Sequence, residues 1–384
     1  MPIPTLQHIP QHILVAPDSF KGTLSSAEVC DIVREAAAAV LPDAEVRCLP
    51  VADGGEGSVD CFLAAAGGVK KELTVTGPLF APVKSFYGVL PDGTAVIETA
   101  AAAGLPLTGD TPSAADTTTY GVGELIADAL SHGCRSLLLC LGGSATNDGG
   151  CGMAVALGVR FFSGGEPFVP TGRTLSDIEK IDPSGAVSRL SGVRFTVLCD
   201  VKNPLCGERG AAYVFAPQKG ATAEEIVLLD RGLFHLAARI KTDLGADVLN
   251  LPGAGAAGGM GGGAAAFLGA RLTPGIEAVL DAARFDERLK TADLVVTGEG
   301  RIDGQSAGGK VVSGVLARAR KAGVPTVALA GALGKGAEQL FGMGLFGMFT
   351  TGRAGLPLDE IKKTAREDLL RAAAAMFRTL TPSC

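Results

Sequence analysis

Polar side chains and glycines gather directly after short apolar segments of this chain, and chemistry is expected at these positions. Asp18, Ser19 and Lys21 follow the first apolar segment, and Asp53 follows the second and precedes two glycines. A lone lysine in a short loop after a strand is well placed to meet a phosphate or a carboxylate. Asp and Ser also favour turns, so an ordinary turn at Asp18 and Ser19 is an equally good interpretation.

A third apolar segment leads into residues 142–150, which contain four glycines and precede a predicted helix. Backbone N–H groups at a helix N-terminus bind anions, and glycine allows a phosphate to come close. A tight turn would explain one or two of these glycines but not four, so the segment is interpreted as a phosphate-binding loop. The residues predicted to bind phosphate there are Gly142, Gly143, Ser144, Thr146 and Asn147.

Asp200 ends the apolar segment 194–199. A carboxylate at that place is costly in a protein core unless it points into a site. Asp200 is therefore the candidate to orient or deprotonate an attacking hydroxyl, or to hold a metal ion. A role as a structural cap is the alternative interpretation.

Two glycine-rich segments match nucleotide-binding motifs only in part. Residues 304–310 match G-x-x-x-x-G-K, but Val311 stands where a P-loop needs Ser or Thr, and the predicted strand ends well before this segment. A Walker A loop is rejected, and Lys310 is kept as a candidate phosphate contact. Residues 253–258 match G-x-G-x-x-G, but they lack a clear preceding strand. A ligand-covering loop or a close helix contact is the favoured interpretation of that segment.

The composition excludes several classes of protein. The net charge is −6 without a dense Lys/Arg cluster, Trp is absent and aromatic residues make up 5%, which argues against nucleic-acid binding. Nine scattered cysteines without C-x-x-C spacing argue against a zinc site or a disulfide framework and for reduced thiols in the cytoplasm. No signal-peptide pattern and no apolar run of roughly 18 residues occurs, so no contact with a membrane is expected.

The residue types left for catalysis are those used in phosphoryl transfer. The chain has four histidines, two of them near its beginning, so a histidine-based triad or metal centre is not expected. Carboxylates, lysines and glycine-rich loops remain. In phosphoryl transfer these groups position the reactants and neutralise charge, and this supplies most of the catalysis.

The periodicity of the sequence predicts similar strand–helix units at both ends of the chain. Ser25 and Glu28 form a capping box for a helix that runs to about residue 40, between two strands. Near the C-terminus a strand at 293–297 precedes a helix at 310–322, and a long amphipathic helix closes the chain. Alternating strands and helices are typical of a parallel sheet. We therefore expect a doubly wound α/β domain built from residues 1–76 and 291–384.

The middle of the chain, residues 77–290, is expected to form an inserted, mixed α/β domain. Its first part is rich in β-strand signals with Pro and Gly turns, and helices are predicted at 121–131, 148–157 and 223–242.

Seven segments in the same order closely resemble the bacterial glycerate kinase family, and together they cover about residues 12–380. These segments are residues 16–22, 50–57, 142–150, 199–205, 216–221, 252–259 and 297–305. The resemblance implies a Rossmann-like domain with an inserted α/β domain and an active site in the cleft between them. It also implies ATP and Mg²⁺ as co-substrates and D-glycerate as the acceptor, phosphorylated at the 2-hydroxyl. A monomer or homodimer is expected.

In the kinase hypothesis each candidate residue has a role. Asp200 acts on the substrate hydroxyl, Lys21 and Arg301 meet the carboxylate or the transferring phosphoryl group, and Glu299 or Asp303 holds Mg²⁺. The remaining expected contacts are Asp18, Ser19 and Asp53 to the substrate, and Gly255 and Gly258 to the nucleotide. Two alternatives stay open: a nicotinamide-dependent oxidoreductase of a small hydroxy acid that uses residues 253–258, and a non-catalytic sensor of a small ligand.

Overall fold

The computed structural model describes residues 6, 8–20, 22–51, 54–55, 57–109, 113–308, 311–352 and 356–380. The chain forms two compact units: unit 1 comprises residues 1–53, 64–66 and 276–384, and unit 2 comprises residues 54–63 and 67–275. The chain thus passes between units near residues 53 and 275, whereas boundaries near 76 and 290 were expected. The earlier first boundary arises because β3 (Val69–Thr76) pairs with β4 (Pro82–Val89) in the sheet of unit 2.

Unit 1 contains a five-stranded parallel sheet with the strand order β14-β13-β12-β1-β2. Its strands are β1 (His12–Val15), β2 (Glu45–Cys48), β12 (Leu294–Ile302), β13 (Thr326–Leu333) and β14 (Gly347–Thr350). The chain starts in the middle of the sheet and crosses outward in both directions, which is the expected doubly wound pattern. The strands from the two ends of the chain join directly, because β1 pairs with β12.

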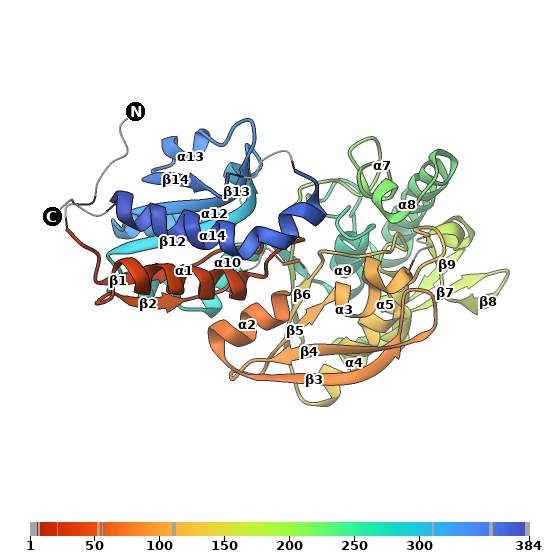
Figure 1. Ribbon diagram of the computed structural model, residues 1–384. Coiled ribbons are helices and arrows are strands. Elements are labelled where there is room, and N and C mark those ends of the chain that lie inside the picture. The colour runs from red at the N-terminus through yellow and green to blue at the C-terminus, as the bar shows by residue number, and fades with distance from the viewer. Residues whose placement is uncertain are drawn as a thin grey trace. The chain divides into compact units, whose positions relative to one another are not determined.

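Helices cover both faces of this sheet. They are α1 (Ser26–Val40), α10 (Gly275–Ala282), α11 (Phe285–Leu289), α12 (Val311–Ala322), α13 (Gln339–Gly342) and α14 (Leu358–Leu380). In Figure 1, α1 and α14 run side by side over one face of the sheet. Val327 and Leu329 of β13 belong to the core beneath these two helices, whereas Ala328 and Ala330 belong to the core beneath α12. Burial on both faces explains why β13 is an almost continuous apolar run.

The N-terminus of α1 confirms the predicted capping box. The Ser25 side chain accepts the backbone N–H of Glu28, and the Glu28 carboxylate accepts the backbone N–H of Ser25. These bonds satisfy two of the N–H groups that a helix start leaves without partners. The cap thereby fixes where the loop after β1 ends.

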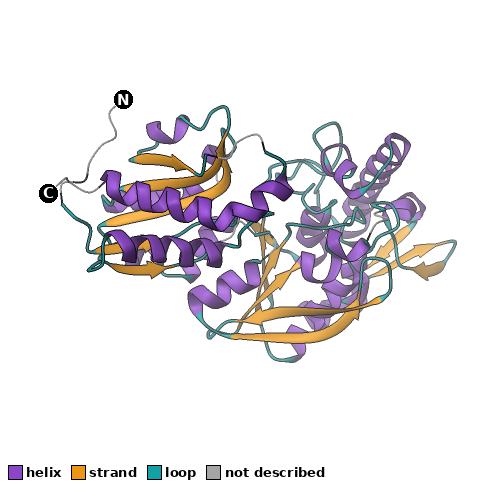
Figure 2. Cartoon of the chain, in the orientation of Figure 1, coloured by secondary structure: helices purple, strands orange, loops and turns teal. Residues whose placement is uncertain are grey.

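Unit 2 contains a six-stranded mixed sheet with the order β11-β10-β6-β5-β4-β3. The strands not yet given are β5 (Thr94–Glu98), β6 (Ser136–Cys140), β10 (Arg194–Leu198) and β11 (Arg271–Thr273). β11, β10, β6 and β5 are parallel, and β4 and β3 complete the sheet as an antiparallel pair. Figure 2 shows β3 and β4 as the long twisted ribbon of this unit.

Helices and a second, three-stranded antiparallel sheet complete unit 2. The small sheet has the order β8-β7-β9 and consists of β7 (Arg160–Ser163), β8 (Glu166–Phe168) and β9 (Lys180–Asp182). The helices are α2 (Ser58–Ala66), α3 (Thr99–Ala103), α4 (Tyr120–Ser131), α5 (Cys151–Ala156), α6 (Ser184–Leu190), α7 (Ala211–Phe215), α8 (Ala223–Leu244) and α9 (Met260–Leu268). In the part of the chain that the structure describes, no helix has the length and apolar character needed to cross a bilayer.

Cys48 of β2 and Cys30 of α1 are hydrogen-bonded to each other in unit 1. The Cys48 thiol donates to the Cys30 carbonyl at 3.5 Å. A hydrogen bond from the Cys30 thiol and the charge of Arg34 lower the pKa of the Cys48 thiol to about 7. Burial instead raises the pKa of Cys199 to about 11 and that of Cys206 to about 12. All three side chains are partly exposed.

Cys48 is expected to be alkylated by iodoacetamide at pH 8 about tenfold faster than Cys199 or Cys206. The thiolate is the reactive form, and its larger population at Cys48 outweighs the lower nucleophilicity of a less basic sulfur. Peptide mapping after brief alkylation measures the three rates separately. A Cys48→Ser variant should lose the fast site, and equal rates at the three positions would contradict the prediction.

Candidate active site

Three parallel strands of unit 2 end side by side and bring predicted site residues to one sheet edge. Glu98 at the end of β5 lies opposite Cys140 at the end of β6, and Cys140 lies opposite Leu198 at the end of β10. The 142–150 loop follows β6, and Asp200 follows β10. The carboxyl edge of such a sheet is where ligands bind in α/β proteins.

The glycines after the predicted Asp53 pack against the beginning of the 142–150 loop. The Gly142 N–H donates to Gly54 O at 3.0 Å. A Cβ atom at Gly142 would lie 2.4 Å from the Cα atom of Gly55, so only glycine allows this approach of two backbones. The glycines after position 53 were expected to allow a close backbone approach, and the backbones at Gly55 and Gly142 approach each other in this way. Asp53 and Lys21, both predicted site residues, lie outside the residues that the structure describes.

Glu98 holds the N-terminus of α2, a role that sequence analysis missed. Its carboxylate accepts the N–H groups of Gly57 at 2.9 Å and Val59 at 3.2 Å, and its side chain is buried. A carboxylate at the start of a helix satisfies N–H groups that lack intrahelical partners and opposes the positive end of the helix dipole. Glu98 stands 41 residues from Gly57 and 39 residues from Val59, so no local sequence pattern predicts the contact.

The 142–150 loop is held by the backbone of the segment after β5. Leu105 N donates to Gly143 O at 3.0 Å, and Ala145 N donates to Ala103 O at 2.8 Å. The loop is exposed at Gly143 and becomes buried from Ser144 onward. An anion from solvent would therefore meet the loop at Gly143 and Ser144.

Asp148 occupies the helix start that was expected to bind phosphate. Its carboxylate accepts Thr119 N and Thr119 Oγ1 at 2.8 Å each, and Gly150 N and Gly152 N at 3.1 Å each. The predicted helix 148–157 is correspondingly shorter, since α5 begins at Cys151 after a left-handed Gly150. The N–H groups of Gly150 and Gly152 thus bind the chain's own carboxylate, and the phosphate contacts predicted at Gly142, Gly143, Ser144, Thr146 and Asn147 stay a prediction.

Lys219 is a candidate that sequence analysis did not single out. It ends the 3₁₀ turn η3 (Pro217–Lys219) and is 3% exposed. Its Nζ donates to Ser144 Oγ at 2.9 Å and to Thr146 O at 2.8 Å. Burial lowers the pKa of Lys219 to about 7, and the Asp148 carboxylate opposes this shift. The available signal was a lysine among Ala, Pro and Gly in the 216–221 segment.

Two of the predicted phosphate contacts are buried with unsatisfied polar atoms. Among the residues with described positions, none hydrogen-bonds to Thr146 Oγ1 or to either side-chain polar atom of Asn147. Each such atom costs about 1–3 kcal/mol, and native proteins retain such costs where a site needs them. Thr146 and Asn147 are fully buried, so they lie beneath the exposed part of the loop.

The glycine-rich segment 253–263 packs against the same loop. A Cβ atom at Gly258 would lie 1.9 Å from Thr146 O, and one at Gly255 would lie 2.3 Å from Pro204 O. Gly149 N also donates to Gly258 O at 3.0 Å. Close backbone packing thus accounts for Gly255 and Gly258, as one of the two interpretations of this segment expected. Their contact with a nucleotide stays a prediction.

The segment 253–258 does not have the context of a dinucleotide fingerprint. That motif follows a strand and opens a helix. Here α8 ends at Leu244, the fully described residues 245–259 contain no strand, and α9 starts at Met260. Nothing in this geometry favours the nicotinamide alternative.

Asp200 lies at the carboxyl edge of the unit 2 sheet, as predicted. Its Oδ1 accepts the N–H of Gly275 at 2.9 Å, and Gly275 is the first residue of α10. The hydrogen bond gives Asp200 the capping role that was the alternative interpretation, and it also fixes the orientation of the carboxylate. A carboxylate that caps a helix can also accept a proton, so the cap does not exclude the predicted reacting role.

Asp18 and Ser19 form the beginning of the loop after β1 in unit 1. Asp18 N donates to Gly298 O at 2.8 Å, and Ser19 N donates to Asp18 Oδ1 at 2.7 Å. Both residues are half-buried. Asp18 therefore lies beside β12 at the carboxyl edge of the unit 1 sheet.

Glu299 and Arg301 lie within β12, not in a loop after it. The strand continues to Ile302 because its pairing with β13 extends to that residue, so the predicted strand end at 297 is wrong. Glu299 is buried, and Arg301 is exposed and pairs with Asp303 at 3.5 Å. Asp303 Oδ1 also accepts Gln305 N at 2.9 Å.

Across the described ranges, no group of three or more His, Cys, Asp or Glu side chains is arranged to hold a metal ion.

The longer strand also corrects one argument about residues 304–310. β12 ends two residues before this segment, so the distance from a strand does not exclude a Walker A loop. The exclusion rests on Val311, which opens α12 where a P-loop needs a hydroxyl. Lys310 lies outside the described residues.

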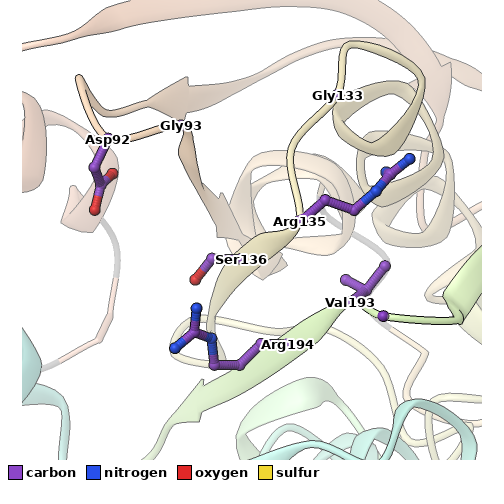
Figure 3. A pocket seen from close by; sticks show the side chains of 8 residues that line it. Asp92, Gly93, Gly133, Arg135, Ser136, Val193 and Arg194 are labelled. Atoms are coloured by element: carbon purple, nitrogen blue, oxygen red, sulfur yellow. The ribbon is translucent and has the colours of Figure 1, made fainter.

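A pocket of about 410 Å³ opens at the opposite edge of the unit 2 sheet (Figure 3). Arg135 and Arg194 line it, and their guanidinium groups point away from each other in this view. Arg135 Nη1 donates to the Leu130 and Cys134 carbonyls at the end of α4. The arginines therefore do not converge on one ligand, and none of the predicted site residues lines this pocket.

Comparison with known proteins settles the family. The model of the glycerate kinase family matches residues 13–381. The chain belongs to this family. The family that the seven ordered segments suggested from sequence is thus confirmed, and glycerate kinases are phosphotransferases.

Relatives in the glycerate kinase family match over nearly their whole length. Glycerate kinase of Halalkalibacterium halodurans is 45% identical over 94% of this chain and 96% of its own. Glycerate 2-kinase of Escherichia coli is 43% identical over 96% of this chain and 97% of its own. A solved protein of Salmonella typhimurium LT2, provisionally assigned as glycerate kinase 2, is 42% identical with a TM-score of 0.84 over 97% of this chain and 98% of its own. The α/β fold of this chain is thus the fold of the family.

Proposed function

We propose that this chain transfers the γ-phosphoryl group of ATP to D-glycerate and forms 2-phospho-D-glycerate. The observation that carries the proposal is the 142–150 loop, where the buried cation Lys219 holds Ser144 above the unsatisfied Thr146 and Asn147. Hydroxyl donors backed by a buried positive charge suit the phosphate oxygens of ATP. Membership of the glycerate kinase family supports the acceptor, and the name of the Escherichia coli relative supports the 2-hydroxyl.

The proposed chemistry assigns one group to each requirement. The 2-hydroxyl oxygen of glycerate forms a bond to the γ-phosphorus while the bond from this phosphorus to the bridging oxygen of ADP breaks. Asp200 receives the hydroxyl proton, since it is the carboxylate at the edge where β10 ends. Ser144 and Gly143 contact the phosphates, and Asp18, Ser19 and Arg301 stay predicted contacts of the substrate.

Mg²⁺ is expected to accompany ATP, and the residues of β12 fit such an ion. Mg²⁺ uses one or two carboxylates and takes its other ligands from water and phosphate oxygens. Glu299 supplies a buried carboxylate within β12, and Asp303 supplies a second one directly after this strand. Glu299 or Asp303 would hold the ion. When bound, the ion neutralises charge on the phosphates.

The direct test measures ADP release with purified protein, Mg²⁺-ATP and a panel of hydroxy acids. D-glycerate should give turnover, and L-glycerate and lactate should give at most a small fraction of it. Replacing ATP with NAD should give no change in absorbance at 340 nm. Binding of ATP without ADP release would instead support the sensor alternative and would end the kinase proposal.

The position of phosphorylation is tested in the same reaction mixture with enolase. Enolase converts 2-phosphoglycerate directly to phosphoenolpyruvate, which absorbs at 240 nm. Immediate absorbance is expected without phosphoglycerate mutase. Absorbance that depends on added mutase would show that the 3-hydroxyl is the acceptor.

A further inference from the structure

Lys219 lies in a short turn that hydrogen bonds and buried neighbours hold rigid. The η3 turn begins with Pro217 and ends at Gly220 in the left-handed region, and Gly220 N donates to Pro217 O at 3.1 Å. Ala216 next to this turn is fully buried and belongs to a small apolar cluster with Ala212 and Leu229. The amine is therefore held in place by its own segment, independently of the loop that it contacts.

The hydrogen bond from Lys219 determines what the Ser144 hydroxyl can do. An ammonium group can only donate hydrogen bonds, so Ser144 Oγ is the acceptor in this bond. Within the described part of the chain, no group accepts the Ser144 hydroxyl proton, so this proton is left for a further acceptor. Ser144 is 6% exposed and directly follows the exposed Gly143. Its hydroxyl thus lies at the boundary between the buried lysine and the surface.

We propose that Lys219 is a positioning residue that fixes the Ser144 hydroxyl as a hydrogen-bond donor to an anionic phosphate group of the nucleotide. This inference rests on the proposed kinase function. Lys219 acts through Ser144, and it also fixes the loop backbone by its bond to Thr146 O.

The protonation state of Lys219 controls the direction of this hydrogen bond. Below pH 7 the amine is charged, and Ser144 is a donor to the ligand. Above pH 7 the free protein loses this charge because burial lowers the pKa of Lys219 to about 7, and a neutral amine can accept the Ser144 proton instead. Asp148 is the titratable group that acts on Lys219, and burial raises the pKa of its carboxyl. The Cys151 thiol near Asp148 stays protonated because burial raises its pKa.

The KM for ATP is therefore expected to rise severalfold between pH 6.5 and 8.5 in the unmodified protein, because phosphate binding favours the charged lysine. Ser144→Ala should raise this KM about tenfold at pH 6.5 and flatten its dependence on pH, although Lys219 is still present. Lys219→Met should do the same. The double variant should be no worse than Lys219→Met alone, because Ser144 acts only together with Lys219.

Ser85→Ala is the matched control. Ser85 is a buried serine of unit 2 whose hydroxyl donates to the Ala101 carbonyl at 2.7 Å. Its loss should lower the melting temperature and leave the pH dependence of the KM for ATP unchanged. An active Ser144→Ala protein with the KM and pH dependence of the unmodified protein would overturn the role of Lys219 and leave the kinase function standing. If the unmodified protein releases no ADP with glycerate, the kinase function itself fails.

Discussion

Asp200→Asn is expected to lower kcat with glycerate by about 10²- to 10⁴-fold, the usual contribution of a general base. The amide cannot accept the hydroxyl proton. Its oxygen can still accept the Gly275 N–H, so the capping bond at the start of α10 survives. Turnover in the ADP-release assay measures the loss, and the melting temperature and the affinity for ATP should change little.

Asp230→Asn separates this effect from the loss of a carboxylate cap. Asp230 lies in the same unit and also accepts one backbone N–H, that of Gly207 at 2.8 Å. This variant should keep the kcat of the unmodified protein. If Asp200→Asn behaves like Asp230→Asn, then Asp200 is a cap alone, and another group must receive the proton.

Gly258→Ala should destabilise unit 2 by at least about 3 kcal/mol, or about 10 °C in melting temperature. The new Cβ would lie 1.9 Å from Thr146 O and 2.5 Å from the Asn147 Cα atom. Both are backbone atoms, so a change of side-chain rotamer cannot relieve the clash. The residue also has a φ of +65°, which L side chains rarely adopt. Because the clash pushes the 142–150 loop, any folded variant should also have a higher KM for ATP.

Gly269→Ala is the control for the backbone conformation. Gly269 has a φ of +62° at the end of α9, and a Cβ atom there would meet nothing within 4 Å. Its cost should be about 1 kcal/mol, the strain of the left-handed region alone. The difference between the two variants, measured by thermal and denaturant unfolding, isolates the clash. Equal losses would show that the two glycine-rich segments do not pack as described.

Local features of this protein were predictable from its sequence because short-range forces produce them. The capping box of Ser25 and Glu28 needs only residues three positions apart, and α1 begins where it predicts. α14 follows from apolar periodicity, and the doubly wound sheet of unit 1 follows from alternating strands and helices. Errors occurred at element ends. β12 is longer than predicted because its pairing with β13 continues through Glu299 and Arg301.

The sequence by itself determined the family, the fold class and the loops that carry polar residues. The tertiary structure decided what those loops do. Asp148 accepts N–H groups at the start of α5, Gly258 allows a close backbone contact, and Lys219 donates to Ser144 from 75 residues away. Hydrogen bonds and packing between distant segments depend on which surfaces the folded core brings together. A local pattern of residues does not predict which surfaces these are.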